Sequence, residues 1–264
     1  MSPRTAISSL SSLPYRAARG AGEMLSKEEK ERYSRQALIP GWDQEKLKGA
    51  NVLVVGLGGL GSASTLYLAA AGVGRLHICD GDRVERSDLN RQVLYSESSI
   101  GLYKVDEASR RIAGLNPSVA VITHNACLDS RNAADIMTDC QVVVDGLDSF
   151  EPRFIVNRES VRRQIPYVYG AVHGWHGYVG FFHPPRTACL ACLMRPDVFK
   201  PDRVPVWGVT PGAIGLIQAG EVVKWALGLT PSLLGRLLIY DGSNLSFEVI
   251  TVEKDPICPV CSSI

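Results

Sequence analysis

The chain has 264 residues, enough to bury a full hydrophobic core, and this length fits one large α/β domain. Its 28 Lys and Arg residues are balanced by 27 Asp and Glu residues, so the net charge of +1 excludes a chain-wide basic surface for nucleic acid or anionic lipid. We therefore expect neither nucleic acid nor a membrane as a partner, and any polyanion must bind at a local site.

The N-terminal stretch 1–23 differs in composition from the rest of the chain. It is rich in Ser, Ala and Arg and holds no acidic residue before Glu23, as in some organelle transit peptides. We favour a disordered tail, or a misassigned start, for residues 1–23. Ser26 followed three residues later by Glu29 is typical of a capping box that opens a helix. The sequence therefore predicts a single folded domain over residues 24–264.

The folded part begins with a βαβ unit. Short helices are expected at 27–36 and 44–48, then a strand at 51–55, a buried helix at 62–71 and a strand at 75–80. Residues 52–74 carry no charge and are long enough for a membrane span. Glycines are clustered in this stretch, however, which favours a buried strand, a tight turn and a buried helix.

Strands and helices continue to alternate up to about residue 164, after which strands predominate. We expect helices at 104–115, 133–138, 153–164 and 212–227, and strands at 120–124, 141–145, 167–171, 177–182, 237–240 and 246–252. The predicted fold is a Rossmann-like, mostly parallel sheet with helices on both faces. It continues into a more antiparallel C-terminal region.

A glycine-rich turn follows the first predicted strand. Gly56, Gly58 and Gly61 satisfy G-x-G-x-x-G between a strand and a helix, where backbone N–H groups and a helix N-terminus can meet a phosphate. Asp80 ends the next predicted strand, at a spacing from Gly61 where a carboxylate can bind ribose hydroxyls. These features alone fit an NAD-dependent dehydrogenase as well as an ATP enzyme.

Cationic side chains after Asp80 distinguish between these two possibilities. Arg91 and Lys104 are not needed by a dehydrogenase, but they can neutralise phosphates when a carboxylate attacks an α-phosphate. Asp145 and Asp148 end another buried strand, where a carboxylate can hold Mg²⁺. We expect Asp148 to be the magnesium ligand of the two.

Two Cys-x-x-Cys pairs predict a metal site. Cys189 and Cys192 lie far along the chain from Cys258 and Cys261, so tertiary folding must join the pairs around a tetrahedral Zn²⁺. With four thiolates the site would be closed and structural; the alternative is a pair of short-range disulfides or a set of unliganded thiols. Thiolates in a chain without a secretory apolar region favour a reducing compartment, and we expect the cytosol.

Taken together, these motifs resemble the adenylyltransferases of molybdopterin and thiamine biosynthesis (MoeB and ThiF types) and the related ubiquitin-activating enzymes. The resemblance runs from about Leu25 to Cys261. It is carried by the following motifs: Arg32-Tyr33-Ser34-Arg35-Gln36, Gly56 to Gly61, Asp80-Gly81-Asp82, Asn90-Arg91-Gln92, Lys104, Asp145-Gly146-Leu147-Asp148, Arg153, Asn157 and both cysteine pairs.

The resemblance implies that the terminal glycine carboxylate of a β-grasp ubiquitin-like protein ending in Gly-Gly attacks the α-phosphate of ATP, with Mg²⁺, and releases pyrophosphate. It implies catalytic roles for Arg35, Arg91, Lys104 and Asp148, with Arg35 reaching across a homodimer interface. It also implies a set of nucleotide contacts: Gly56, Gly58, Gly59, Gly61, Asp80 at the ribose, Asp82, Asn90, Arg91, Gln92, Lys104 and, through Mg²⁺, Asp148.

The sequence departs from this family at two places. Ser149 replaces the asparagine that usually follows the aspartate at position 148, which puts any nucleotide contact from that position in doubt. Many members carry a cysteine in the loop after the first Cys-x-x-Cys, whereas residues 193–257 contain none and the matching region 203–208 offers no nucleophile. We therefore expect adenylation without a covalent enzyme intermediate, the carboxyl passing to a thiol or sulfur donor on another protein. That protein would be a conjugating enzyme or a sulfurtransferase.

Other functions remain as alternatives. They are a ubiquitin-activating enzyme that forms its own thioester through a non-standard cysteine, a dinucleotide-dependent oxidoreductase, and a catalytically silent scaffold. The other thiols, Cys79, Cys127 and Cys140, are expected at strand ends or in the core. His173 and His176 fit a metal or acid–base pair, but also a loop at the rim of a cleft, where Trp175 and Tyr178 offer apolar surface to a bound protein tail.

Overall fold

The structure is a computed structural model that describes residues 25–194 and 204–262. The predicted N-terminal tail lies outside the described residues. In chain order the elements are α1 (Lys27–Arg32), η1 (Gln36–Leu38), α2 (Gln44–Lys48), β1 (Asn51–Val55), α3 (Gly59–Ala71), β2 (Arg75–Cys79), η2 (Arg86–Asp88), η3 (Glu97–Ser99), α4 (Lys104–Leu115), β3 (Ala120–His124), α5 (Ala133–Ile136), β4 (Val142–Asp145), α6 (Phe150–Arg163), β5 (Tyr167–His173), β6 (His176–Phe182), α7 (Leu190–Leu193), α8 (Val209–Ala226), β7 (Arg236–Asp241) and β8 (Ser246–Thr251).

One eight-stranded sheet organises the described residues, with strand order β3-β2-β1-β4-β5-β6-β7-β8. Strands β1 to β5 pair in parallel, and β5, β6, β7 and β8 then pair antiparallel. This confirms the predicted parallel sheet with an antiparallel C-terminal region. Because the chain leaves β1 toward β2 and β3 and then returns to β4 on the other side of β1, the strand order reverses between β1 and β4.

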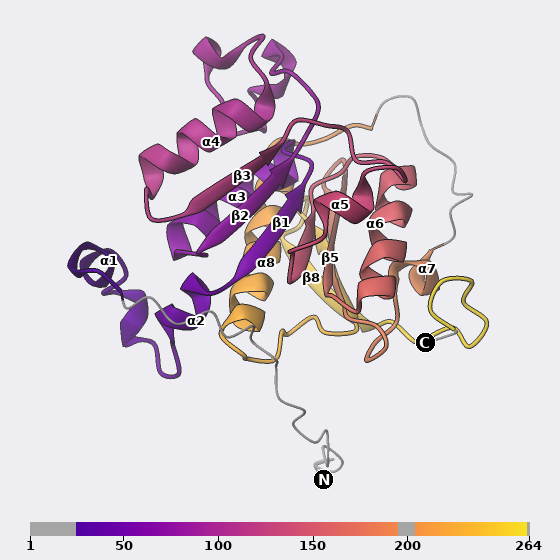
Figure 1. Ribbon diagram of the computed structural model, residues 1–264. Coiled ribbons are helices and arrows are strands. Elements are labelled where there is room, and N and C mark those ends of the chain that lie inside the picture. The colour runs from indigo at the N-terminus through magenta and orange to yellow at the C-terminus, as the bar shows by residue number, and fades with distance from the viewer. Residues whose placement is uncertain (1–24, 195–203, 263–264) are drawn as a thin grey trace.

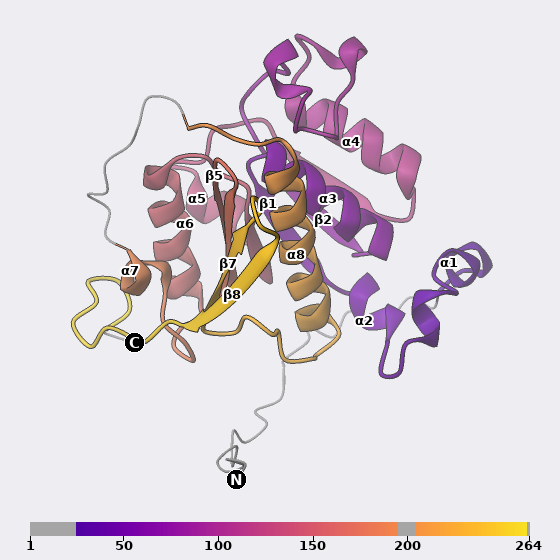
Figure 2. The same ribbon diagram turned by 180° about the vertical axis from the view of Figure 1, so that it is seen from behind.

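Helices cover both faces of the sheet (Figures 1 and 2). On one face α3 packs closely on α8, and α4 lies beside α3. On the other face α5 and α6 cover the central strands, with α7 packed against α6. Apolar side chains fill the space between the sheet and each helical layer, because the central parallel strands are buried on both sides.

The uncharged stretch 52–74 folds as β1, the glycine turn and α3, as the sequence predicts. All five residues of β1 are buried, and most of α3 is buried between the sheet and α8. Burial on both sides removes the need for charged residues. Among the residues that the structure describes, no helix is long and apolar enough to cross a membrane.

The predicted helix at 27–36 was wrong in its second half. The helix ends at Arg32, and a separate turn of 3₁₀ helix covers Gln36–Leu38. Tyr33 leaves the helix because its ring is buried in the domain, where its hydroxyl accepts a hydrogen bond from Asn116 Nδ2 at 2.8 Å. The expected capping box at Ser26 and Glu29 is present. Strand boundaries agree with the predictions closely, whereas α3, α6 and α8 each begin nearly one turn earlier than predicted.

Candidate functional site

The glycine turn lies where the strand order reverses. Gly56 follows β1 and Gly146 follows β4, and their backbones touch: a Cβ atom on Gly56, whose φ is +85°, would lie 2.7 Å from the Gly146 carbonyl oxygen. The Gly146 N–H donates to the Val55 carbonyl at 2.8 Å. Such a switch point is where open α/β sheets bind ligands. Both strands therefore end at the place where this rule expects a ligand crevice, and the glycine turn lies at that place.

The remaining glycines of the turn allow close packing. Gly58 caps α3, and a Cβ on Gly61 would lie 1.9 Å from the Gly56 carbonyl oxygen. A Cβ on Gly59 would meet Pro211, in the first turn of α8, at 2.9 Å. The N-terminus of α3 is thus held by contacts that only glycine allows, and its first N–H groups can bind a phosphate.

Asp80 reaches this turn from the end of β2. Its Oδ2 accepts a hydrogen bond from Leu57 N at 2.7 Å, and its Oδ1 accepts one from Asp82 N at 2.8 Å. Burial raises the pKa of the Asp80 carboxyl, and the nearby Lys104 charge opposes that rise. The carboxylate is thereby fixed beside the glycine turn. Its contact with a ribose stays a prediction.

The two predicted cations, Arg91 and Lys104, meet around a carboxylate that the sequence prediction missed. Asp88 is 7% exposed; its Oδ1 lies 3.3 Å from Arg91 Nη2 and its Oδ2 lies 3.9 Å from Lys104 Nζ. Asp88 Oδ1 also accepts a hydrogen bond from Gln92 Nε2 at 2.8 Å. Asp88 therefore gathers Arg91, Lys104 and Gln92 beside the glycine turn. Its only sequence signal was its place in the stretch 87–92, close to Arg91.

The other predicted nucleotide contacts surround this cluster. Asp82 is exposed, and its Oδ2 lies 3.3 Å from Lys104 Nζ, while Asn90 Oδ1 accepts a hydrogen bond from Arg91 Nη1 at 3.1 Å. Gln92 is buried, and a Cβ on Gly58 would lie 3.8 Å from its Nε2. The structure therefore brings together the residues predicted to contact a nucleotide from the ends of β1 and β2, from the segment before α4 and from the start of α4.

The two aspartates after β4 have different surroundings. Asp145 is fully buried; its Oδ2 lies 3.1 Å from Arg153 Nε and accepts a hydrogen bond from the Tyr167 hydroxyl. Because its oxygens are committed to protein partners, Asp145 is unsuited to bind a metal ion. Asp148 is exposed three residues further on, at the same edge of the sheet as Gly146. Of the pair, only Asp148 is free to reach a ligand in the crevice.

Arg35 does not join the cluster within the same chain. It precedes η1, whose Gln36 Nε2 donates to the carbonyl of Ala71, the last residue of α3. The glycine turn lies at the opposite end of α3, and 13 helical residues span about 20 Å. The exposed Arg35 side chain therefore lies far from the glycine turn of its own chain.

The four paired cysteines converge as predicted. Their Sγ atoms all lie within 4.8 Å of one another, with Cys189 to Cys258 at 3.7 Å and Cys192 to Cys261 at 3.5 Å. Zn–S bonds of about 2.3 Å in a tetrahedron place sulfurs about 3.8 Å apart, so the cluster fits this metal. All seven cysteines of the chain are free thiols, which argues against the disulfide alternative. Among the described residues, no other group of three or more acidic, His or Cys side chains converges in this way.

A buried asparagine supports the cysteine cluster from α6. Asn157 Nδ2 lies 3.7 Å from Cys189 Sγ, and its Oδ1 accepts a hydrogen bond from Leu190 N at 2.9 Å. Such contacts orient the ligands of metal sites. The cluster joins the C-terminal segment to α7, and it shares no residue with the glycine turn or with the cations beside it.

The remaining thiols differ in accessibility. Cys79 and Cys140 are buried, and burial raises the pKa of each thiol to about 12. Cys127 is exposed in the loop after β3, so the expectation that all three lie at strand ends or in the core was wrong for this residue. A Cβ on Gly81 would lie 2.7 Å from its Sγ. Cys127 is thus the one accessible thiol among these three.

The segment before α8 contacts the turn between β5 and β6. Gly174 N donates to the Pro205 carbonyl at 2.7 Å, and Trp207 N donates to the Gly174 carbonyl at 3.1 Å. The rings of Trp175 and Trp207 pack with centroids 4.6 Å apart. Trp207 belongs to the region 203–208, which was expected to lack a nucleophile, and its ring packs on Trp175 of the β5–β6 turn.

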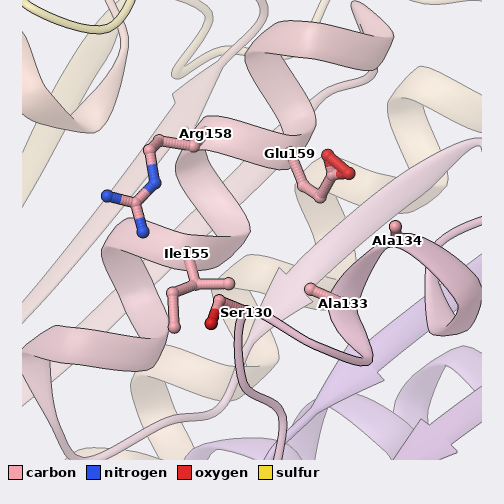
Figure 3. Close-up of a pocket in the computed structure, with 6 residues that line it drawn as sticks. All are labelled: Ser130, Ala133, Ala134, Ile155, Arg158 and Glu159. Atoms are coloured by element: carbon pink, nitrogen blue, oxygen red, sulfur yellow. The ribbon is translucent and has the colours of Figure 1, made fainter.

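A pocket on the other side of the sheet is unrelated to the crevice. It lies between α5 and α6 (Figure 3). Its lining residues are Ser130, Ala133, Ala134, Ile155, Arg158 and Glu159. None of the predicted site residues lines it, and the Glu159 carboxylate is already paired with Arg162.

Curated proteins from bacteria and archaea are similar to this chain. The chain is 42% identical over 250 residues to the sulfur carrier protein adenylyltransferase of Thermus thermophilus, covering 89% of the chain and 92% of that protein. It is 38% identical to the SAMP-activating enzyme E1 of Haloferax volcanii, covering 88% of each. It is also 38% identical to the probable adenylyltransferase/sulfurtransferase MoeZ of Mycobacterium tuberculosis, covering 89% of the chain but only 63% of MoeZ.

A solved structure and a family match agree with this relationship. The crystal structure of E. coli MccB with MccA-N7isoASN matches with a TM-score of 0.80 at 22% identity, covering 88% of this chain and 74% of MccB, which establishes the shared fold. The ThiF family matches residues 33–260, from Tyr33 to the residue before Cys261, the last cysteine of the four-cysteine cluster. The chain therefore belongs to the ThiF family.

Proposed function

We propose that the protein uses ATP to adenylate the C-terminal Gly-Gly carboxylate of a ubiquitin-like β-grasp protein and releases pyrophosphate. The observation that carries this proposal is the cation pair Arg91 and Lys104, gathered by Asp88 beside the glycine turn. The names of the relatives, which include a sulfur carrier protein adenylyltransferase and an activating enzyme E1, support the same activity. The partner would be a sulfur carrier or a protein modifier.

The geometry suggests how the chain would hold the nucleotide. The Asp80 carboxylate would accept hydrogen bonds from the ribose, while the N–H groups at the start of α3 face the phosphates. Arg91 and Lys104 would exchange part of their pairing with Asp88 and Asp82 for the phosphate oxygens. A dehydrogenase would leave these cations without a purpose, which disfavours the oxidoreductase alternative.

The chemical step needs positioning and charge neutralisation but no general base. A terminal carboxylate is already ionised at neutral pH. Its oxygen would bond to the α-phosphorus, while the bond from that phosphorus to the bridging oxygen breaks and pyrophosphate leaves. Arg91 and Lys104 would offset the repulsion between the approaching carboxylate and the phosphates.

Asp148 is our proposed magnesium ligand. It is exposed at the crevice, whereas the oxygens of neighbouring Asp145 are held by Arg153 and Tyr167. Mg²⁺ is usually bound through one or two carboxylates together with substrate phosphates. When bound, it would neutralise charge on the leaving phosphates.

We also propose a homodimer in which Arg35 enters the triphosphate site of the neighbouring protomer. Arg35 lies at the far end of α3 from its own glycine turn, so it can act only in another chain. Leu38 and Ile39, which follow it, are 76% and 52% exposed, as expected of an uncovered interface. If Arg35→Ala and Asp148→Ala subunits are mixed, activity should return through one intact composite site; no rescue would contradict the arrangement.

The activated carboxyl would pass to a thiol or sulfur donor on another protein, such as a conjugating enzyme or a sulfurtransferase. Residues 193–257 contain no cysteine, and Cys79 and Cys140 are buried. Cys127 would be the nucleophile if the enzyme formed its own thioester, the alternative outcome. Cysteines that form no disulfide suit a reducing compartment, and we propose the cytosol.

ATP–pyrophosphate exchange with a Gly-Gly-terminated β-grasp protein tests this function. Arg91→Ala and Asp148→Ala should each lower the exchange rate by about 100-fold or more, because each removes charge stabilisation of the transferring phosphates. Arg86→Ala is the matched control, since Arg86 precedes Arg91 by only five positions and pairs on the surface with Glu97. Exchange that survives both substitutions, or that never appears with any such partner, would refute the proposal.

A further inference from the structure

A buried arginine in the first turn of α6 contacts the segment that carries Asp148. Arg153 is 5% exposed, and its Nη2 donates a hydrogen bond to the carbonyl of Leu147, the residue directly before Asp148. The same Nη2 donates to the Gly170 carbonyl of β5 at 2.9 Å. One guanidinium therefore joins the segment after β4 to the neighbouring strand.

The guanidinium is itself held in place by Asp145, the last residue of β4. Arg153 Nε lies 3.1 Å from Asp145 Oδ2, which also accepts a hydrogen bond from the Tyr167 hydroxyl. The other carboxylate oxygen, Asp145 Oδ1, accepts a hydrogen bond from Leu147 N at 2.9 Å. Leu147 is thus fixed at both its N–H and its carbonyl group, and Asp148 follows it directly.

The two residues before Leu147 are held in the same way by other elements. Gln218, buried in α8, donates from Nε2 to the Asp145 carbonyl at 2.9 Å. The Gly146 N–H donates to a carbonyl of β1 at 2.8 Å. Each residue of 145–147 is therefore fixed by a hydrogen bond to α8, β1 or α6, and the chain reaches Asp148 from a rigid turn.

Stability alone does not explain the buried ion pair of Arg153 and Asp145. Removing two charges from water offsets much of their attraction, so apolar residues of similar volume often stabilise a core equally well. The guanidinium adds geometry instead. Its planar set of donors holds one carboxylate and two carbonyls in fixed directions, which the single ammonium of a lysine does not do.

We propose that Arg153 is a positioning residue for Asp148. By fixing the carbonyl of Leu147, it keeps the Asp148 carboxylate where Mg²⁺ and the nucleotide phosphates can meet it. The inference rests on the proposed function, in which Asp148 is the magnesium ligand. Arg153 itself would touch neither the metal ion nor the nucleotide, because its donors face Asp145, Leu147 and Gly170.

Calorimetric titration of the full-length protein with ATP tests this role without any turnover. The dissociation constant is measured once with Mg²⁺ and once in buffer freed of divalent ions, and the ratio of the two constants gives the magnesium gain in ATP affinity. The wild type should show a gain of about tenfold or more, and Arg153→Lys should lose most of it. Without divalent ions its ATP affinity should stay unchanged, because the glycine turn and the cations beside it are not altered.

Arg163→Lys is the matched control. Arg163, the last residue of α6, also donates to a backbone carbonyl, that of Ala134, so its substitution should keep the magnesium gain. Urea unfolding of each variant would establish that it is folded. If Arg153→Lys does not fold, the Asp145→Asn, Arg153→Met double variant leaves no buried charge unpaired and should show the same loss of magnesium gain.

An Asp148→Ala background separates positioning from a general structural role. There Arg153→Lys should not weaken ATP binding further, since the side chain that it positions is gone. Loss of the magnesium gain in both single variants supports the role, whether or not pyrophosphate exchange is found. The inference is overturned if Asp148→Ala loses the gain while a folded Arg153→Lys variant keeps it, or if Arg153→Lys weakens binding further in that background. If Asp148→Ala keeps the gain, the proposed magnesium ligand is wrong and the role of Arg153 falls with it.

Discussion

Gly56 and Gly146 lie backbone against backbone where β1 and β4 end, and a Cβ atom on Gly146 would lie 2.2 Å from the Gly56 carbonyl oxygen. The contact holds the two sides of the switch point together, and it keeps the glycine turn against the segment that follows β4. The sequence showed a glycine at each position, but the contact depends on two strands that are far apart along the chain.

Gly146→Ala should therefore destabilise the domain by about 1–3 kcal/mol or more, because the added methyl group forces two packed backbones apart. The free energy of unfolding, measured with urea, would test this. Gly114→Ala is a matched control: this glycine lies within α4 with nothing within 4 Å of an added Cβ, so alanine should stabilise the helix slightly. Equal stability of the Gly146→Ala variant and the wild type would contradict the contact.

Asp88 is expected to be a positioning residue for the phosphate-binding cations. Asp88→Asn removes the charge that holds Arg91 and Lys104 together, so the KM for ATP should rise by about tenfold, the effect of losing one charge-assisted hydrogen bond. The rate at saturating ATP should change less, which a general loss of folded enzyme would not produce. Asp106→Asn, on the exposed side of α4, should leave both constants unchanged.

The stacked pair His77 and His124 predicts a pH dependence of stability. His77 Nδ1 lies 3.1 Å from His124 Nε2, and burial lowers the pKa of both imidazoles from 6.5. The unfolded chain binds protons below about pH 6.5 that the folded pair refuses, so the free energy of unfolding should fall as the pH drops below that value.

Urea titrations at pH 7.5, 6.5 and 5.5 measure this slope. His124→Gln removes one titrating ring and keeps a side chain able to donate to His77, so its stability should fall less between pH 6.5 and 5.5. His183, whose pKa burial also lowers, contributes equally to both proteins. A slope unchanged by the substitution would show that the pair does not titrate in this way.

The cysteine cluster should hold one zinc ion per chain and stabilise the fold. Cys258→Ser removes one of four ligands, so zinc content should fall by at least half and the melting temperature should drop. Metal analysis of the purified protein measures the first effect. Cys127→Ser, which alters the exposed thiol outside the cluster, should retain its zinc. Wild-type protein that contains no zinc after purification without chelators would contradict this role.

Hydrophobic periodicity, the glycine turn and the cysteine spacing were sufficient to predict most of this fold. The apolar run before Gly56 and the alternation of strands and helices predicted the parallel sheet, and the two Cys-x-x-Cys pairs predicted the cluster. The prediction of one helix over residues 27–36 was wrong because Tyr33 turns inward and contacts Asn116. Local helix propensity does not encode such a tertiary contact.

The sequence predicted the charged residues of the candidate site, but it did not predict the residues that hold them in position. Arg91 and Lys104 could be predicted because cations neutralise phosphate charge. The role of Asp88 depends on the tertiary contact between η2 and the start of α4. The same holds for Asp145, whose burial against Arg153 separates it from Asp148. Arg35 stays a prediction because its proposed partner lies in another chain.

The most direct test of the account is mass spectrometry of a Gly-Gly-terminated β-grasp partner after incubation with the enzyme, ATP and Mg²⁺. We predict an acyl-adenylate at the partner's C-terminus, formed with release of pyrophosphate, and no thiol-cleavable conjugate with the enzyme. A partner lacking its last glycine is the control and should stay unmodified. A partner that gains no adenylate, or that becomes joined to the enzyme through a thioester, would contradict the proposed reaction.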